Sequence, residues 1–480
     1  MTNRIKFTAL AAALAWAASA AAANDLAHVY QLAKDRDPIL REAEANYMAA
    51  KEAKPLAWAA YLPQITGFMS ETTADNTGTS TDFDSNSVTG FSDYVRDTTT
   101  DSSFWSLTLR QTVFNWSKFK DIRAGSAAAA QADAEYQYAL QQFVIRVADR
   151  YFGQLASADT LEAARLNREA IGRQLEQAKK RFEVGLIAVT DVQESQAAFD
   201  QATADEIAAE RSYESSREVL RESTGDYVDD LVRPSEGMPL IDPTPATTAD
   251  WVKLAMEQNL NLIASRLAAE SAAHSLGAAW GAHYPTLDFV AQQSNSVSNT
   301  EGTVDRTSGT PASFNQASDS DGDQTSLALQ LSIPLFAGGA TQSGVRQARY
   351  RSDAADQRLE RVTRETQRTA SDALLGVTSE IARTKALRQA AQSSATALRA
   401  TEAGFEVGTR TTVDVLDARR NLLRAEVSYR RAKYDYLLNT LRLKQAAGTL
   451  VEPDVATVNN WLTAPAPVAE PAAKAPTPKK

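Results

Sequence analysis

Two carboxylates, Asp414 and Asp417, are the polar residues whose spacing is most informative, because they lie three residues apart in a helical segment. Residues at this spacing share one face of a helix. In a symmetric oligomer they would form two stacked rings of negative charge. In a narrow tube such rings attract cations and disfavour one another's ionised form. The alternative is an ordinary acidic helix face exposed to solvent.

The sequence lacks the residues that most metal sites, catalytic sites and phosphate-binding loops require. The 480 residues include no cysteine and three scattered histidines, His28, His274 and His283, too few for most zinc sites or general-base catalysis. The DSDGD run at 319–323 does not match a calcium-binding loop, and AGGATQSG at 337–344 lacks the lysine of a phosphate-binding loop. The net charge of −10 disfavours nucleic-acid binding. We therefore expect no enzyme, no cofactor, no metal and no nucleic acid.

Residues 1–23 have the composition of a cleaved export signal. Arg4 and Lys6 precede a short apolar run at 7–18, and small residues follow at 21–23. No cysteine follows for lipid attachment, and no later stretch has the ~20 apolar residues of a transmembrane helix. We predict an exported protein without a helical membrane anchor.

The remaining chain reads as a duplication. RFEVGLIAVTDV at 181–192 recurs as GFEVGTRTTVDV at 404–415, and Phe114 recurs as Phe336 at nearly the same offset. We therefore divide the chain into a first repeat at 24–245, a second at 246–450 and a C-terminal tail at 451–480. The tail is rich in proline and alanine from residue 464, where we expect disorder.

Each repeat alternates between two hydrophobic periods. Leu140, Phe143, Val144, Val147 and Tyr151 show helical spacing. The pattern predicts, in each repeat, short helices, a β-hairpin, a long helix and a return helix. In the first repeat the last three lie at 61–114, 115–184 and 189–223, and in the second at 284–336, 337–406 and 411–447. The hairpins are expected to have strands of about ten residues, joined by polar loops at 70–103 and 293–325.

The strands alternate apolar and polar residues, as in outer-membrane barrels. Trp105, Phe104, Phe68 and Phe289 are candidates for aromatic girdles at the membrane interfaces. Four strands cannot close a barrel, and eight leave an interior that side chains fill. We predict that three chains build a twelve-stranded barrel, continued by a tube of long helices.

The repeated turn FEVGTRTTVDVLDARRNLLRAE and the segment YDYLLNTLRLKQAAGTL resemble the TolC family of trimeric outer-membrane efflux and secretion ducts. The resemblance covers residues 24–450. It implies a homotrimer in outer-membrane lipids with a long periplasmic α-helical barrel. It also implies a periplasmic membrane-fusion adaptor and an inner-membrane pump or ABC exporter as partners. Asp414 and Asp417 match the selectivity rings at the closed periplasmic tip of the family.

The repeated turn supplies further candidates. Gly185 and Gly408 are expected to end the long helices, because glycine tolerates the left-handed conformation. Asp191 and Asp414 are equivalent, yet only the second repeat has an arginine, Arg410, four residues earlier, where the first has Ile187.

This asymmetry suits a latch in which Arg410 reaches Asp191 and Thr190 across an interface. The resemblance implies that such links hold the tip shut. It also implies that one link is missing, because Phe405 replaces the family's tyrosine and has no hydroxyl to bond Asp191. The alternative is that Arg410 is a surface cation in a fraying turn.

The sequence thus predicts a passive outer-membrane exit duct for small molecules or polypeptides, gated at its periplasmic tip. The rival interpretation is a non-conducting periplasmic coiled-coil scaffold or adaptor.

Overall fold

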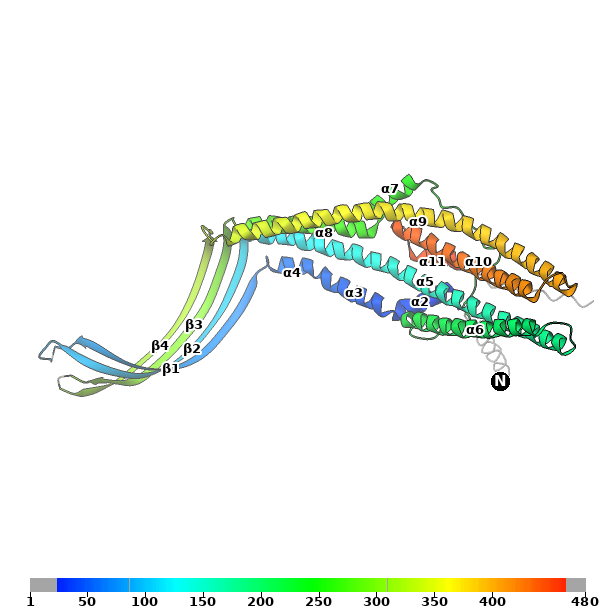
Figure 1. The fold of residues 1–480 in the computed structure, drawn as a ribbon. Coiled ribbons are helices and arrows are strands. Elements are labelled where there is room, and N and C mark those ends of the chain that lie inside the picture. The colour runs from blue at the N-terminus through cyan, green and yellow to red at the C-terminus, as the bar shows by residue number, and fades with distance from the viewer. Residues whose placement is uncertain (1–23, 86, 309, 463–480) are drawn as a thin grey trace, which may run out of the picture. The chain divides into compact units, whose positions relative to one another are not determined.

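The computed structural model describes residues 24–462, apart from residues 86 and 309. The described helices are mostly long, and all four strands join one antiparallel sheet in the order β1-β2-β3-β4 (Figure 1). In chain order the elements are α2 (Leu26–Arg36), α3 (Pro38–Lys51), α4 (Ala53–Ala59), β1 (Gln64–Phe83), β2 (Phe91–Phe114), α5 (Trp116–Glu183), α6 (Val189–Thr224), α7 (Thr248–Gln258), α8 (Leu260–Gly281), β3 (Thr286–Arg306), β4 (Ala312–Ser332), α9 (Ala340–Glu406), α10 (Thr412–Ala446) and α11 (Glu452–Asn459).

The chain divides into two compact units. Unit 1 contains the residues up to Ala49, Gln131–Arg266 and the residues from Arg358, and unit 2 contains Ala50–Ala130 and Leu267–Gln357. Among the described helices, none combines the length and the hydropathy that crossing a membrane requires. The expected export signal at 1–23 and the proline-rich segment from 464 lie outside the described residues.

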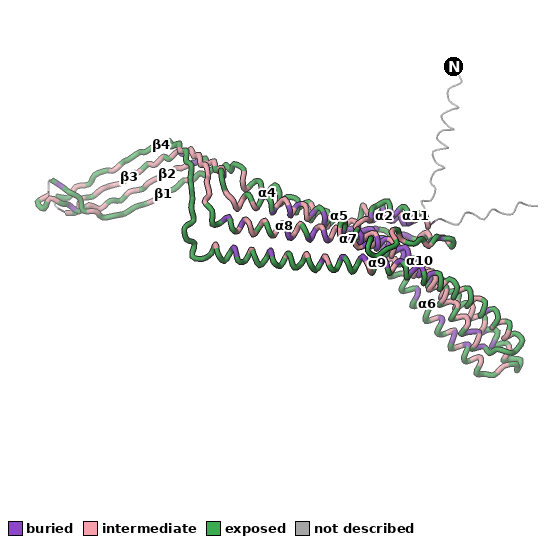
Figure 2. Tube along the Cα trace, turned by 90° about the horizontal axis from the view of Figure 1, so that it is seen from above, coloured by how far each residue is buried: buried purple, intermediate pink, exposed green. Residues whose placement is uncertain are grey.

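Unit 1 holds the hydrophobic core. The apolar residues with helical spacing on α5 enter it, and Phe143, Val147 and Tyr151 are fully buried. They pack with α2, α10 and α11, and the buried residues gather on these helices in Figure 2. Burying each large side chain contributes about 2 kcal/mol. The core therefore fixes the middle of the long helices, while their ends carry mostly small and polar residues.

A buried carboxylate ties three parts of unit 1 together. Asp159 on α5 is 1% exposed and accepts a hydrogen bond from the Tyr434 hydroxyl on α10 at 2.5 Å. Its Oδ1 also lies 3.0 Å from Arg233, in the connector after α6, and 3.3 Å from Arg430 on α10. Burial and the neighbouring Asp159 charge raise the pKa of Tyr434 far above its usual value. Because its partners are 74 to 275 residues away, no local pattern indicates this cluster.

Unit 2 holds the sheet. Two expectations about it were wrong, the strand length of about ten residues and the assignment of the polar segments to loops. The polar segments at 70–103 and 293–325 are not loops but continue the strands, which are 20, 24, 21 and 21 residues long. Cross-strand hydrogen bonds between hydroxyls and carboxylates explain the difference, for example Thr73 to Asp101 at 2.7 Å and Thr99 to Asp75 at 2.7 Å. The connections between the strands shrink to 84–90 and 307–311.

The C-terminal tail also begins with structure. Residues 452–459, which we had placed in the tail, form α11, and Val455, Val458 and Leu462 are buried in the core of unit 1. Asp454 caps this helix by accepting a hydrogen bond from the Val451 amide at 2.9 Å. Lys444 on α10 lies 2.5 Å from the same carboxylate, so this stretch is anchored rather than loose.

Candidate functional site: the two helix-to-helix turns

The first turn joins α5 to α6 at residues 184–188. Gly185 has φ +76°, and the Leu186 amide donates to the Arg181 carbonyl at 2.9 Å. Only glycine adopts this conformation without strain, so the long helix stops here. Asp191 lies in the first turn of α6, and its Oδ2 accepts from the Ala188 amide at 3.2 Å. Ala188 has no side-chain oxygen to return the bond, so the cap is only half of a capping box.

The second turn joins α9 to α10 at residues 407–411 and has the same backbone. Gly408 has φ +79°, and the Thr409 amide donates to the Gly404 carbonyl at 2.9 Å. Here the capping box is complete. The Asp414 amide donates to the Thr411 hydroxyl oxygen at 3.2 Å, and the Thr411 amide and hydroxyl donate to Asp414 Oδ2 at 2.8 and 2.9 Å.

These hydrogen bonds set the charge of Asp414. The bonds from the Thr411 amide and hydroxyl, and the nearby Arg410 charge, lower the pKa of the Asp414 carboxyl. We had expected neighbouring carboxylates to disfavour the ionised form, and within one chain the cap produces the opposite effect. Asp417 is exposed and lies 3.3 Å from Arg420, also on α10. The Asp414 carboxyl is therefore ionised at neutral pH, and both carboxylates are partly occupied by local partners.

Arg410 is positioned by its backbone and its stem. Its amide donates to the Gly404 carbonyl at 3.2 Å, and a side chain at Gly404 would meet Arg410 Cγ at 2.8 Å. Within the described chain, the Arg410 guanidinium makes no hydrogen bond or ion pair, and Asp191 and Thr190 do not contact it. Arg410 and Thr190 are both exposed, so a single chain does not bring the predicted latch together.

The ring of Phe405 contacts α5. The Arg181 guanidinium of α5 lies 5.1 Å from the centre of the Phe405 ring, a cation–π contact near both turns. A second contact that sequence reasoning missed joins α9 to α10, where Arg419 lies 2.5 Å from Glu402. Both contacts join residues 17 or more positions apart, and the sequence carries no signal for either.

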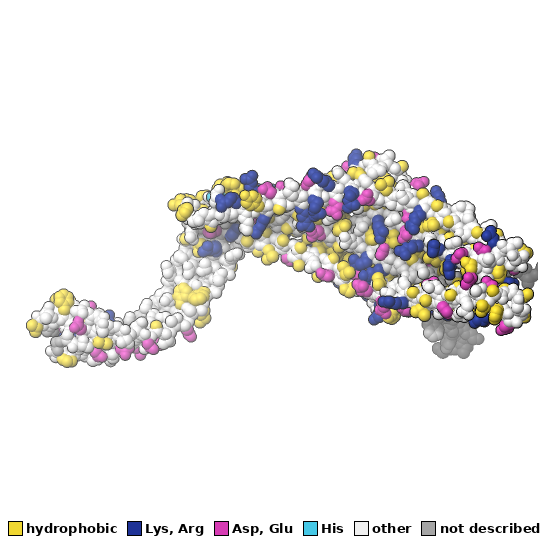
Figure 3. All heavy atoms as spheres, in the orientation of Figure 1, with side chains coloured by type: hydrophobic (Ala, Val, Ile, Leu, Met, Phe, Trp, Pro, Cys, Tyr) yellow, Lys and Arg dark blue, Asp and Glu magenta, His cyan; other side chains and the backbone are white. Residues whose placement is uncertain are grey.

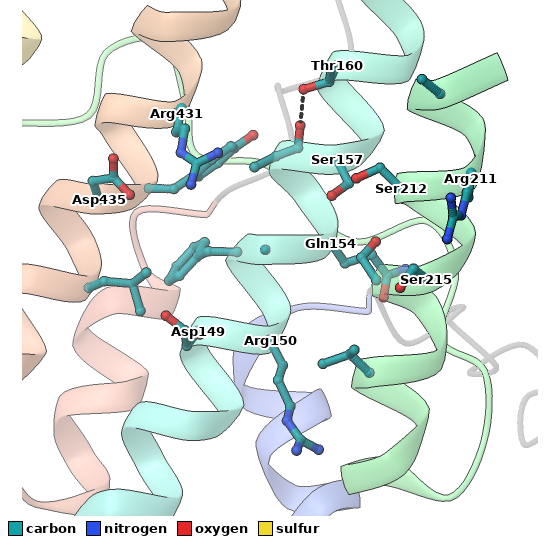
Figure 4. A pocket seen from close by; sticks show the side chains of 18 residues that line it. Asp149, Arg150, Gln154, Ser157, Thr160, Arg211, Ser212, Ser215, Arg431 and Asp435 are labelled. Carbon is teal, nitrogen blue, oxygen red and sulfur yellow. Dashed lines mark hydrogen bonds between the residues drawn. The ribbon is translucent and has the colours of Figure 1, made fainter. Parts of the chain in front are cut away.

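A polar hollow lies further along the same helices, between α5, α6 and α10 of unit 1. It has a volume of about 790 Å³ and is lined by small and charged side chains. In Figure 4, Ser157, Ser212 and Ser215 lie on facing helices, with Arg150 and Arg211 near them. These lining residues include no histidine or cysteine, and no nucleophile paired with a base. The hollow is therefore a polar groove between three helices.

The comparisons with known proteins decide the family. The model of the outer membrane efflux protein family matches residues 29–226 and 251–449, which correspond to the two repeats. The chain belongs to the outer membrane efflux protein family. It is 36% identical to outer membrane protein TolC of Vibrio cholerae over 94% of this chain and 97% of that protein. It is 30% identical to the alkaline protease secretion protein AprF of Pseudomonas aeruginosa, over 89% and 85%.

Solved structures agree on the fold. The crystal structure of CusC superposes with a TM-score of 0.70 at 17% identity, covering 89% of this chain and 92% of that one. The resemblance to TolC and the expected fold are thus confirmed. This outer membrane efflux protein is an outer-membrane exit duct of efflux or secretion that extends into the periplasm. It works as a trimer with a periplasmic adaptor and an inner-membrane pump.

Proposed function

We propose that this duct is passive and that its gate is formed by the two turns described above. Cargo, either small molecules or polypeptides, would pass through it with no bond made or broken, and the partners would supply the energy. The observation that carries the proposal is the position of the charged groups. Arg410, Asp414 and Asp417 all lie within nine residues of Gly408, at the end of a helical hairpin.

The latch is supported by the groups that remain free in one chain. Asp191 uses Oδ2 to cap α6, and its Oδ1 makes no hydrogen bond to the described residues. The Arg410 guanidinium is likewise without a partner among them. In the trimer, Arg410 of one hairpin would donate to Asp191 Oδ1 and to Thr190 of a neighbouring hairpin. Such a pair is strong but releasable, because both sides remain solvated.

The carboxylate rings are supported in the same way. Asp414 accepts both Thr411 bonds on Oδ2, and Asp417 meets Arg420 through Oδ1. Each carboxylate thus keeps one oxygen for a passing cation. Threefold symmetry would place six such oxygens in two rings at the constriction, where negative potential is focused. Phe405 would lack one closing link, because its ring has no hydroxyl to bond Asp191, and the ring packs on Arg181.

The test is single-channel recording of the mature trimer in a planar lipid bilayer, with a trivalent cation added on the tunnel side. We expect small cation-selective currents that the trivalent cation blocks. Asp414→Asn combined with Asp417→Asn should abolish the block and weaken the selectivity, while the amide oxygen introduced by Asp414→Asn can still accept the capping bond. Unchanged block in this variant would overturn the ring assignment.

A further inference from the structure

The two faces of the sheet in unit 2 differ in charge. Successive residues of a strand point to opposite faces, so odd-numbered and even-numbered side chains separate here. The hydrogen bonds named here between side chains of different strands join residues on the same face. Thr73 bonds Asp101 and Thr77 bonds Asp97 on the odd face, while Thr100 lies 3.0 Å from Thr300 on the even face.

Nearest the helices, the odd face carries a band of apolar side chains, and several are more than 60% exposed in the single chain, including Ile65, Met69, Leu327 and Leu329. Outward-pointing apolar residues are what the lipid-facing side of a membrane-spanning barrel requires. We call the odd face the outward face and the even face the lumen face.

The four aromatic residues that we expected in interfacial girdles lie on both faces of the sheet, two on each. Trp105 and Phe289 have odd numbers and lie on the outward face, as a girdle requires. Phe68 and Phe104 lie on the lumen face, where their ring centres are 6.1 Å apart. With this face assignment, these two phenylalanines point into the lumen and do not contribute to a girdle.

The acidic residues of the strands are concentrated on the outward face, beyond the apolar band. Acidic side chains are visible over the strands in Figure 3. Of the acidic residues in the four strands, ten have odd numbers and no strand Lys or Arg does. The ten are Glu71, Asp75, Asp93, Asp97, Asp101, Glu301, Asp305, Asp319, Asp321 and Asp323.

The lumen face holds all three arginines of the strands, and each lies near a carboxylate. Arg110 lies 3.9 Å from Asp288 at the helical end of the sheet. At the opposite end, Arg96 lies 3.0 Å from Asp82, and Arg306 pairs with Asp84 of the β1–β2 loop. Between these ends, the even-numbered residues of the described strands are uncharged, and most are Ser, Thr, Gln or Asn.

We propose that Arg110 and Asp288 cancel each other's charge on the lumen face at membrane level, so that the barrel has no charge preference there, and that the ten outward carboxylates lie outside the conduction path. The proposal rests on the trimeric barrel of the family. Three Arg110–Asp288 pairs then form a ring of zero net charge, followed outward by a hydroxyl and amide lining. Such a barrel passes cargo of either sign, so selection by charge is confined to the periplasmic tip.

The first test removes one partner of the pair at a time. Reversal potentials in a salt gradient are measured in the Asp414→Asn, Asp417→Asn background, so that the tip rings no longer dominate. Arg110→Gln leaves three unpaired carboxylates in the lumen and should shift the preference toward cations. Asp288→Asn leaves three arginines and should shift it toward anions. Shifts of the same sign, or no shift, would overturn the role of this pair.

The matched control neutralises charges on the other face. Asp97→Asn combined with Asp321→Asn removes six carboxylates per trimer and should leave the reversal potential unchanged. A shift toward anions in this control would show that the outward carboxylates contribute to conduction, and would contradict the proposal. The ion selectivity of the Asp414→Asn, Asp417→Asn variant, compared with the unmodified channel, tests the carboxylate rings at the tip. The reversal potentials of the further variants test the barrel, so each proposal can fail without the other.

The second test requires no current. The chain has no cysteine, so single cysteines can be placed at neighbouring positions on opposite faces, Asp97→Cys against Thr98→Cys and Asp321→Cys against Ser320→Cys. Trimers in phospholipid nanodiscs are labelled with a biotin maleimide and mixed with streptavidin, which is too large for the lumen. Streptavidin should bind native trimers labelled at 97 or 321, and those labelled at 98 or 320 only after denaturation. The reverse pattern, or equal binding, would refute the face assignment.

Discussion

The two turns of the duplicated chain have one backbone and different side chains. Both end a long helix at a glycine with φ near +78°, and both cap the next helix with an aspartate. The second turn adds Arg410 and Thr411 where the first has Ile187 and Ala188. The duplication has therefore kept the residues that shape the turn and changed those that can interact across an interface. Only the second turn combines Arg410 with a complete cap, whereas both turns have a second carboxylate three residues after the capping aspartate, Glu194 in the first and Asp417 in the second.

The largest effect on gating is expected from the arginine that distinguishes the second turn. Arg410→Ala should raise the open probability of the trimer at least about fivefold, corresponding to ~1 kcal/mol for each lost link. Ile187→Ala, at the equivalent position of the first turn, is the control and should leave the open probability unchanged. Single-channel recording measures both. An Arg410→Ala channel with the same open probability as the unmodified protein would mean that other residues hold the gate shut.

The glycines should show equal effects in the two repeats. Gly408→Ala and Gly185→Ala each force a residue with a side chain into the left-handed region, at a cost of about 1–2 kcal/mol. Hydrogen exchange should become roughly tenfold faster at the amides of Thr409 and Leu186, which close the helix ends. A marked difference between the two variants would show that the turns are not equivalent in backbone strain.

The caps should respond in opposite directions. Thr411→Ala removes the hydroxyl from the complete capping box and should destabilise the first turn of α10 by about 1 kcal/mol. Ala188→Thr supplies the missing hydroxyl at the first turn and should stabilise the start of α6 by a similar amount. Hydrogen exchange at the Asp414 and Asp191 amides provides the readout. Slower exchange at Asp191 in Ala188→Thr would show that the two caps differ by this hydroxyl alone.

The smallest effect concerns pH. The pKa of Asp414 is lowered by the Thr411 bonds, so the cap is fully formed above the ordinary aspartate pKa of about 3.9. Its contribution is lost only as the pH falls through the lowered value. Protection of the first turn of α10 should therefore persist at about pH 4 and decline below it. Asp414→Asn should show no such decline. Loss of protection already above pH 4 would contradict the capping role.

The repeated motif was enough to predict the turns, because glycine, the preceding phenylalanine and the aspartate recur at one offset. The spacing of Thr411 and Asp414 is also that of a capping box, so one aspartate carries two signals in the sequence, a helix cap and a pore charge. The contact of Arg181 with Phe405 could not be predicted, since the two residues are more than two hundred positions apart and belong to different repeats.

The strands illustrate a different limit of sequence reasoning. Ser, Asp, Asn and Gly are depleted in strands or typical of turns, so the composition of 70–103 predicted a loop, although its many threonines favour strands. The alternation that places Asp97 and Asp101 opposite Thr77 and Thr73 becomes informative only once the register is known. The segregation of charge between the two faces follows from the same register.

The strands have a further consequence for what leaves the duct. Each is 20 to 24 residues long, whereas a membrane-spanning strand needs about ten. The excess corresponds to about 33 Å of extended chain before tilt is considered. The exit is therefore raised well above the lipid surface. A hydrophobic molecule released at that height must diffuse through water before it can partition into the bilayer again. Dilution into the medium therefore competes with its return to the cell.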